Sequence, residues 1–451
     1  MEKFDPKSIK KFRFVSWDFD EVKSMASFHY AFDDTYTFTE EMDFHVPGLA
    51  LSSERREALN KCLEHLFLVV GISYYKAALP PEIVIENFEI SEETALFMEG
   101  LYLNGLGDFA YKNKLDLRGK IKFPFSSTHK PSPSDLPLRQ QTAVPLGGGK
   151  DSVATLEVMR SAKEPIVLFA FGDFSPIKEV AKISGLPFIT VSRRISPALL
   201  ELNSQGALNG HIPISSIIAF VLTAAAVLYD FDVAVLSNER SANVGNVVVD
   251  GFSINHQYDK SFDFEKKISL YLKTHVLSQF SYFSFLRPLS ELSITRLFSK
   301  DTPYHHSFTS CNAVFRIKDD MKGRLWCLNC PKCLSTFLLL APFIDKESLL
   351  SVFKENLLND EKHMDGYAEM LGLKGHKPFE CVAEPEEYMA AFFLLLLKPE
   401  WKDDLLVKHF AGSIPSEFSD PKYLDNTVFR FSEEHLLPAR FEKILREALR
   451  T

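Results

Sequence analysis

A glycine-rich segment at residues 146–152, LGGGKDS, has the residue types of a phosphate-binding loop. An apolar run, Ala143–Leu146, precedes it, and a helical pattern over Asp151–Ser161 follows. Glycines let the backbone approach an anion closely, and the free N–H groups at the start of a helix bind phosphate oxygens. The lysine adds a positive charge and the serine a hydroxyl donor. We therefore predict a phosphate-binding site that consists of Gly147, Gly148, Gly149, Lys150, Asp151 and Ser152.

The spacing of this loop separates it from the commonest nucleotide-binding motif. Val144 stands where a Walker A loop begins with glycine, and Asp151 replaces its Ser or Thr. The loop resembles the S-G-G-x-D-S motif of the PP-loop ATP pyrophosphatases, with Gly147 for the leading serine. That resemblance implies that ATP is split between its α- and β-phosphates and adenylylates a substrate oxygen. The alternative is a tight strand-to-helix turn whose glycines serve geometry alone.

The two charged residues of the loop are expected to lie in an exposed turn. Substitution of Lys150 or Asp151 should then abolish pyrophosphate release and leave the fold intact.

Four cysteines follow the pattern C-x15-C-x2-C-x2-C, at Cys311, Cys327, Cys330 and Cys333. In a reducing compartment such a cluster indicates a metal site rather than disulfides. Four thiolates close a tetrahedral Zn²⁺ site and leave no catalytic position open, so we predict a structural zinc. The alternative is a set of small buried hydrophobes at a helix start. Cys62 and Cys381 have no close partners in sequence and are interpreted as core thiols, although the polar surroundings of Cys381 leave a functional role open.

Polar segments follow the other apolar runs, at the edge where open α/β sheets bind ligands. Arginine suits phosphate or carboxylate groups, and the candidates are Arg193, Arg194 and Arg240. A carboxylate suits Mg²⁺ on the pyrophosphate, and the candidates are Asp173 and Glu239. The catalytic candidates are Glu239, Arg240, His211, His256 and Lys260. For each of them the alternative is a solvated loop charge or a hydrogen-bonded structural residue, and the sequence does not identify the acid and base.

The elements that must position these residues follow an α/β pattern. Short apolar runs at Ala143–Leu146, Ile166–Phe171, Phe188–Val191 and Val233–Leu236 predict strands. Helical patterns lie between them at Asp151–Ser161, Pro176–Ser184 and Ile214–Tyr229. This alternation predicts a parallel α/β sheet.

The flanking regions have other patterns. Apolar and polar residues alternate in the first 47 residues, which predicts a small antiparallel sheet, and helical patterns follow at Ser52–Val70 and Ser91–Asn113. Residues 126–142 are rich in proline and serine. We predict an α+β domain at 1–125, a linker at 126–142, a PP-loop ATP-binding domain with the cysteine cluster at 143–345, and a helical region at 346–451.

Bulk composition favours a globular cytoplasmic protein with a small or mid-sized substrate. Hydrophobic residues make up 46% of the chain, and the formal net charge of -9 disfavours nucleic-acid partners. The N-terminus lacks the features of a secretory signal, and the apolar stretches Ile212–Leu228 and Tyr388–Leu397 do not suit a membrane span. Oligomeric state is not indicated.

A broader resemblance covers residues from about 70 to 381. The segments that carry it are GISYYKAALPP, LYLNGLGDFAYKNKLDLRGKI, VPLGGGKDS, LNGHIPIS, SNERSAN, NHQYDKS, LRPLSEL, FTSCNAVFR, WCLNCPKC and KPFEC. Together they resemble the MurL family, the epimerases of UDP-N-acetylmuramoyl-L-alanyl-L-glutamate in bacterial peptidoglycan synthesis. The resemblance implies that the terminal L-Glu of this UDP-linked dipeptide becomes D-Glu, with ATP and Mg²⁺ consumed and AMP and pyrophosphate formed.

Three rival interpretations remain from the sequence. An enzyme of the 7-cyano-7-deazaguanine synthase type also combines a PP-loop with four cysteines, but the N-terminal region and the last hundred residues exceed its compact fold. A tRNA-thiolating enzyme is disfavoured by the acidic charge. A non-enzymatic ATP sensor would leave the polar loops idle.

Overall fold

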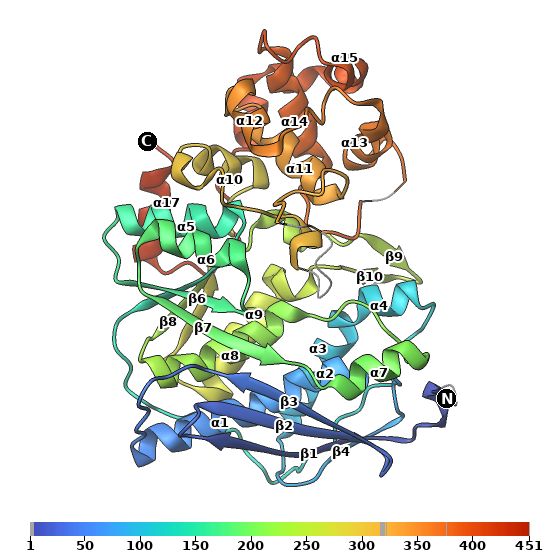
Figure 1. Cartoon of the computed structure of the whole chain (residues 1–451), viewed down its shortest axis with the longest axis vertical. Helices are drawn as coiled ribbons and strands as arrows, with labels where there is room; N and C mark the ends of the chain where they lie inside the picture. Colours follow the sequence, from blue (N-terminus) through green and yellow to red (C-terminus); the bar gives the residue numbers. More distant parts are fainter. Residues whose placement is uncertain (1–3, 316–320, 322, 376, 451) are drawn as a thin grey trace.

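The computed structural model describes residues 4–315, 321, 323–375 and 377–450. Within these residues, nine strands form one mixed sheet in the order β11-β8-β5-β6-β7-β3-β2-β1-β4, and β9 pairs with β10 in a hairpin (Figure 1). The strands are β1 Lys11–Asp20, β2 Met25–Phe32, β3 Tyr36–Asp43, β4 Glu82–Ile85, β5 Thr142–Pro145, β6 Ile166–Phe171, β7 Phe188–Arg194, β8 Val233–Leu236, β9 Val247–Val249, β10 Phe252–Ile254 and β11 Ser281–Ser284.

The helices flank this sheet and form the C-terminal part of the chain, which lies at the top of Figure 1. They are α1 Ser53–Val70, α2 Ile72–Tyr75, α3 Glu92–Gly105, α4 Gly107–Lys112, α5 Lys150–Ser161, α6 Ser175–Ser184, α7 Pro197–Gln205, α8 Ile214–Tyr229, α9 Phe262–Tyr271, α10 Glu291–Phe298, α11 Pro331–Leu340, α12 Lys346–Phe353, α13 Met364–Met370, α14 Pro385–Leu396, α15 Leu405–Phe410, α16 Pro421–Thr427 and α17 Ala439–Ala448. Among the described residues, none of these helices has the length and apolar character needed to cross a membrane.

The predicted parallel α/β core is confirmed. Strands β11, β8, β5, β6 and β7 are mutually parallel. The chain runs from β5 outward to β6 and β7, then returns to place β8 on the other side of β5. The order therefore reverses between β5 and β8, and the crevice beyond the carboxyl ends of strands at such a point is where open α/β sheets bind ligands.

Alternate residues of the parallel strands pack into two hydrophobic cores. On β6, Val167 and Phe169 join the core that includes α1 and α8, whereas Leu168 and Ala170 join the core that includes α5 and α6. Side chains of a strand point to opposite faces in turn, so a strand buried on both faces is apolar throughout. This explains the unbroken apolar run of IVLFAF.

The N-terminal strands differ from the predicted small separate sheet. They are antiparallel as expected, but β3 also pairs with β7, with Met42 opposite Arg193. The unpaired N–H and C=O groups of an edge strand can accept another strand, and β3 uses those of β7. One sheet thus links the N-terminal strands to the region of the glycine-rich loop, while the division into four segments remains a prediction.

A second difference concerns the predicted helix Ser91–Asn113. The structure has two helices there, α3 and α4, with Leu106 between two glycines at the break. A Cβ atom on Gly105 would lie 2.6 Å from Cγ of Pro213, so the chain needs a glycine where it passes the segment before α8.

Candidate active site

The glycine-rich loop lies after β5, at the point where strand order reverses. Gly148 has a φ of +76°, a conformation that favours glycine, and a Cβ atom there would lie 3.3 Å from Cγ1 of Ile177. Gly149 caps the N-terminus of α5 without a side-chain hydrogen bond. The first N–H groups of this twelve-residue helix and its positive dipole end therefore face the crevice beyond the sheet.

The expectation of an exposed loop is wrong for Lys150. Its side chain is 5% exposed, and its Nζ forms ion pairs with Asp151 and with the buried Glu291 of α10. Burial opposes its charge, yet these two carboxylates hold the pKa of Lys150 above its usual value. Because α10 packs on α5, the lysine is part of the protein interior, whereas the Asp151 side chain is 34% exposed.

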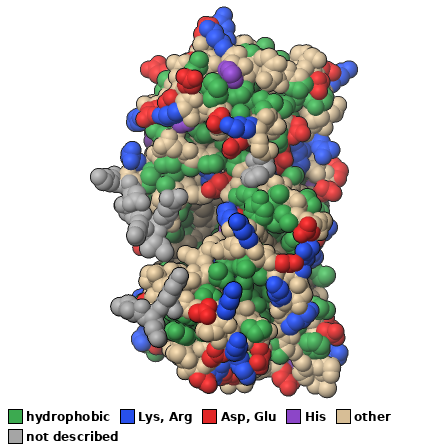
Figure 2. Space-filling view, turned by 90° about the vertical axis from the view of Figure 1, so that its right-hand side faces the viewer, with side chains coloured by type: hydrophobic (Ala, Val, Ile, Leu, Met, Phe, Trp, Pro, Cys, Tyr) green, Lys and Arg blue, Asp and Glu red, His purple; other side chains and the backbone are tan. Residues whose placement is uncertain are grey.

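A cavity of about 420 Å³ opens over this loop. Its polar wall includes Gly147, Asp151, Ser152, Asn238, Lys260 and Lys332. Its apolar wall includes Phe169, Phe171, Phe174, Ile177, Ile214 and Ile218. A cavity with one apolar side and a few convergent polar groups beside free helix N–H groups is suited to a nucleotide. In Figure 2, Lys and Arg side chains lie over the middle of the face shown, among Asp, Glu and hydrophobic side chains.

The segment before the cysteine cluster braces the loop. The Thr309 N–H donates to the Gly148 carbonyl at 2.8 Å, and a Cβ atom on Gly149 would lie 3.0 Å from Oγ of Ser310. Ser310 immediately precedes Cys311, and Lys332 lies between Cys330 and Cys333. The cysteine cluster thus adjoins the wall of the cavity through its neighbours in sequence.

The four cysteines lie together as the spacing predicted. Their Sγ atoms all lie within 4.8 Å of one another, with separations of 3.5 Å between Cys330 and Cys333, 3.7 Å between Cys327 and Cys333, and 4.0 Å between Cys330 and Cys311. A Zn–S distance of about 2.3 Å and tetrahedral geometry require S–S separations of about 3.8 Å. The cluster therefore fits a zinc ion.

Three of the candidate polar residues at the sheet edge lie in ion pairs. Arg193 donates to both carboxylate oxygens of Glu40 at 2.7 and 3.0 Å, and Arg194 pairs with Glu41. These contacts join β7 to β3. Asp173 pairs with Lys178 on the surface.

Glu239 and Arg240 are occupied by structural contacts. The buried Glu239 carboxylate accepts hydrogen bonds from the N–H and Oγ of Ser241. Arg240 donates to the carbonyls of Thr427, Val428 and Arg430 near the end of α16. These hydrogen bonds link the C-terminal region to the loop after β8. Burial lowers the pKa of Arg240. Neither residue is part of the cavity wall described above.

Lys260 lines the cavity and contacts a cysteine that the sequence left without a partner. Its Nζ lies 3.3 Å from Sγ of Cys381. Cys381, above all, and then Asp259 raise the pKa of Lys260 against the opposing effect of burial. Asp259 itself accepts from the N–H groups of Ser215 and Ser216, so it caps α8 and fixes the segment that carries Lys260.

The two candidate histidines form one cluster with Asp108 of α4. The rings of His211 and His256 lie 4.2 Å apart, and Nδ1 of His256 lies 3.0 Å from the Asp108 carboxylate, which Lys112 also contacts at 3.0 Å. Burial, and then His256, lower the pKa of His211 to about 3, so its ring is neutral. Three such ligands could hold a divalent cation, but Lys112 already balances the buried carboxylate. The arrangement is therefore better suited to proton transfer by His256.

Sequence reasoning missed Arg287, which joins the loop that carries Glu239 to the segment that carries Lys260. This fully buried side chain donates to the carboxylate of Glu265 at 2.7 and 2.9 Å, to the carbonyl of Glu239 at 2.6 Å and to the carbonyl of Lys260 at 2.5 Å. Among the described residues, no hydrogen-bond partner of the Arg287 side chain is near it in sequence, and the segment LRPLSEL gave no chemical signal beyond its place in the resemblance.

An Arg287→Met variant is expected to lose about 3–5 kcal/mol of stability, because it leaves the Glu265 charge buried without its partner. Urea denaturation would measure this loss. In an Arg287→Met/Glu265→Leu double variant part of the stability should return. Equal loss in the single and double variants would show that the ion pair is not the cause.

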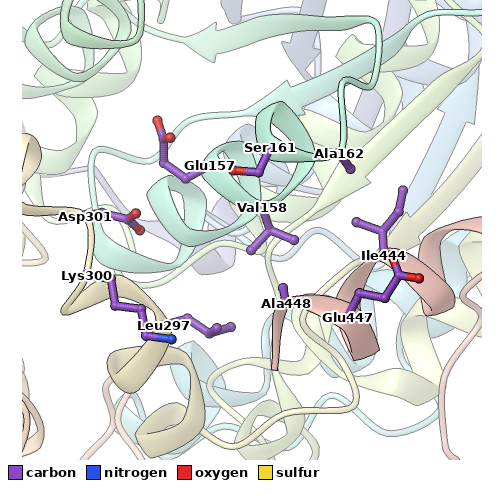
Figure 3. A pocket seen from close by; sticks show the side chains of 10 residues that line it. All are labelled: Glu157, Val158, Ser161, Ala162, Leu297, Lys300, Asp301, Ile444, Glu447 and Ala448. Carbon is purple, nitrogen blue, oxygen red and sulfur yellow. The ribbon is translucent and has the colours of Figure 1, made fainter. Parts of the chain in front are cut away.

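A second cavity, of about 300 Å³, lies between α5, α10 and α17 (Figure 3). Glu157 and Asp301 face it, and burial, followed by the Glu157 charge, raises the pKa of Asp301 to about 7. It adjoins the C-terminal half of α5, where the helix dipole is negative and disfavours phosphate. The cavity at the glycine-rich loop is thus the better nucleotide site.

Comparisons with known proteins agree with one another. Residues 3–285 match the family model for the MurL N-terminal domain, and residues 307–423 match that for the MurL C-terminal domain. A protein of Xanthomonas oryzae pv. oryzae named UDP-N-acetyl-alpha-D-muramoyl-L-alanyl-L-glutamate epimerase is 40% identical over 98% of this chain and 99% of its own length. A Micromonospora protein of the same name is 38% identical over 96% of this chain and 97% of its own.

Proposed function

Because the chain belongs to the MurL family and is, like its relatives, an epimerase, we propose that it converts the terminal L-Glu of UDP-N-acetylmuramoyl-L-alanyl-L-glutamate to D-Glu in an ATP-dependent reaction. The observation that carries the ATP dependence is the cavity over the glycine-rich loop, at the point where strand order reverses. The substrate is the one in the names of its relatives. The cytoplasm, where a UDP-linked precursor would be made, is the proposed location.

The proposed chemistry begins with adenylylation. An α-hydrogen beside an ionised carboxylate is hard to remove, since the carbanion would form next to an existing negative charge. If the carboxylate attacks the α-phosphate of ATP, pyrophosphate leaves and an acyl-adenylate forms. Its enolate can then be stabilised by cations and N–H donors. A base removes the α-proton, an acid returns one to the opposite face, and water releases AMP.

The cavity residues support this sequence of steps. The N–H groups at the start of α5, with Ser152, are suited to the pyrophosphate leaving group. Lys260 and Lys332 supply positive charge on the same wall. Of the carboxylates near the loop, Asp151 lines the cavity and is the best placed to hold Mg²⁺, in place of the earlier candidates Glu239 and Asp173.

We also propose that the cysteine cluster holds a structural zinc ion. The sulfur separations support this ligand set, and four thiolates leave no open position for catalysis. The ion would fix the segment that braces the glycine-rich loop.

The test of the proposed function uses UDP-N-acetylmuramoyl-L-alanyl-L-glutamate, ATP and Mg²⁺ in D₂O. We expect AMP to form and the D-Glu product to carry deuterium at Cα, because the proton must pass through exchangeable groups. Mass spectrometry, chiral analysis of the released glutamate and an AMP assay measure this.

The rival ligase of the 7-cyano-7-deazaguanine synthase type is tested in parallel. Added ammonia should yield no amide, since water is the proposed final nucleophile. If the UDP-linked substrate gained no deuterium and stimulated no AMP formation, while a deazapurine carboxylate with ammonia did, the proposed substrate and reaction would be wrong.

A further inference from the structure

We propose that Cys381 and His256 are the two proton carriers of the epimerisation, one for each face of the glutamyl Cα. The inference rests on the proposed function. Inversion through an enolate needs one group to take the α-proton and another to deliver a proton to the opposite face. The structure places two such groups, a thiol and an imidazole from distant segments, close to Lys260 of the cavity wall: Cys381 contacts the Lys260 side chain, and His256 lies four residues before Lys260.

Cys381 is held as an acid–base group by its surroundings. Its Sγ contacts Nζ of Lys260, the residue that lines the nucleotide cavity. The thiolate form of a cysteine accepts a proton, and the thiol form donates one. Lys260 is then a positioning residue, which places the sulfur at the edge of the cavity.

The segment that carries Cys381 is fixed on both sides. Before it, the Phe379 ring stacks on Tyr111 of α4, with ring centroids 5.3 Å apart, and Glu380 accepts a hydrogen bond from Asn312 of the cavity wall. After it, the Val382 carbonyl accepts from Oγ of Ser241 at 3.4 Å. These contacts fix the backbone on both sides of the thiol.

His256 has the arrangement of an oriented acid–base histidine. Nδ1 donates to the buried Asp108 carboxylate, which leaves Nε2 for proton transfer. Burial opposes ionisation of Asp108, but His256 and Lys112 hold its pKa below the usual value, so the carboxylate can stabilise an imidazolium. The neutral His211 ring packs beside His256 and lies three residues before Ile214, which lines the nucleotide cavity.

A hydrogen-bond bridge ties the two carriers together. The Asn246 side chain accepts from the backbone N–H of His256 at 2.8 Å and donates to the Pro378 carbonyl at 2.8 Å, three residues before Cys381, so it joins the two backbone segments. Lys260 makes a second link, since it is four residues after His256 and contacts Cys381. Lys260, which lines the cavity, is thus near Cys381 in space and near His256 in sequence.

The two proton transfers balance in protons and electrons. One carrier in its basic form takes the Cα proton, and the electron pair of the C–H bond becomes the enolate of the acyl-adenylate. The other carrier, in its acid form, gives its proton to the opposite face of Cα. The carriers end with exchanged protonation states, and solvent restores both.

The test uses Cys381→Ser and His256→Gln in the full-length protein, with His409→Gln on the exposed surface of α15 as the control. Each active-site variant should lose epimerisation by at least about 100-fold, the contribution of a general acid or base. ATP–pyrophosphate exchange with the substrate should stay within about threefold of the unaltered protein. Thermal unfolding of all variants confirms that they are folded.

Deuterium exchange distinguishes proton carriers from structural residues. In each variant one carrier remains. With ATP in D₂O, the variant whose remaining carrier faces the α-proton of the L-epimer should exchange that proton without inverting the substrate. The other variant should do so with the D-epimer. This complementary pattern supports the proposal. Identical exchange patterns, inversion within tenfold of normal in either variant, or loss of ATP–pyrophosphate exchange together with inversion would overturn it.

The same data separate this inference from the proposed function. If the unaltered protein inverts the substrate and the variants do too, only the choice of carriers is wrong. If the unaltered protein forms no AMP with this substrate, the proposed function fails and the inference fails with it.

Discussion

A Cys330→Ser variant is expected to be purified with almost no zinc, whereas the unaltered protein should carry about one ion per chain. The variant should also unfold at a temperature lower by roughly 5–10 °C, because metal binding to a closed site contributes to folding. Cys330 has two of the short sulfur contacts in the cluster, at 3.5 and 4.0 Å. Metal analysis and thermal unfolding measure the two effects.

The matched control for this variant is Cys62→Ser. Cys62 is fully buried in the other hydrophobic core, so this change should lower stability but keep the zinc. The Cys330→Ser variant should also lose AMP formation, since Thr309 and Ser310, which brace the glycine-rich loop, directly precede Cys311. Equal zinc in both variants and the unaltered protein, or no zinc in the unaltered protein, would contradict the assignment.

Local sequence patterns predicted four of the five parallel strands, whereas β11 was not predicted. The apolar runs at β6 and β8 and the helical pattern of α8 have the predicted bounds, and α5 begins one residue earlier than expected. The two strands are continuous apolar runs and the two helices have a helical pattern, so each signal lies within a short window. The glycine-rich loop was found because its chemistry depends on consecutive residues.

Contacts between distant segments could not be predicted in the same way. Arg240 was a candidate for phosphate, but its partners are carbonyls almost two hundred residues later in the chain. Cys381 had no partner in sequence, and Lys260 became one through folding. A charged loop residue has the same local signal whether it binds a substrate or a second segment of its own chain.

The second prediction with a large expected effect concerns AMP formation after a substitution in the glycine-rich loop. An Asp151→Asn variant is expected to fold normally and to lose at least about 100-fold in AMP formation. The side chain is one-third exposed and lines the cavity, so its removal costs little packing but takes away a charge beside the phosphates. Circular dichroism and a pyrophosphate assay measure the two properties, and near-normal turnover would show that the loop does not bind ATP in this way.

Lys150→Met is the matched comparison. Because the Lys150 side chain is buried, we expect this variant, unlike Asp151→Asn, to lose stability. The variant leaves the Glu291 carboxylate buried without its cation, which should cost about 3–5 kcal/mol at pH 8. Burial raises the pKa of Glu291 above its ordinary 4.5, and removal of the lysine raises it further. Glu291 can therefore bind a proton in the folded variant at a pH where it stays ionised in the unfolded chain. The stability lost by the variant should accordingly be smallest below about pH 4.5 and should grow as the pH rises toward 8 and above. Urea denaturation at pH 5 and pH 8 measures this, and a loss of stability that is the same at both values would show that Lys150 does not balance the charge of Glu291.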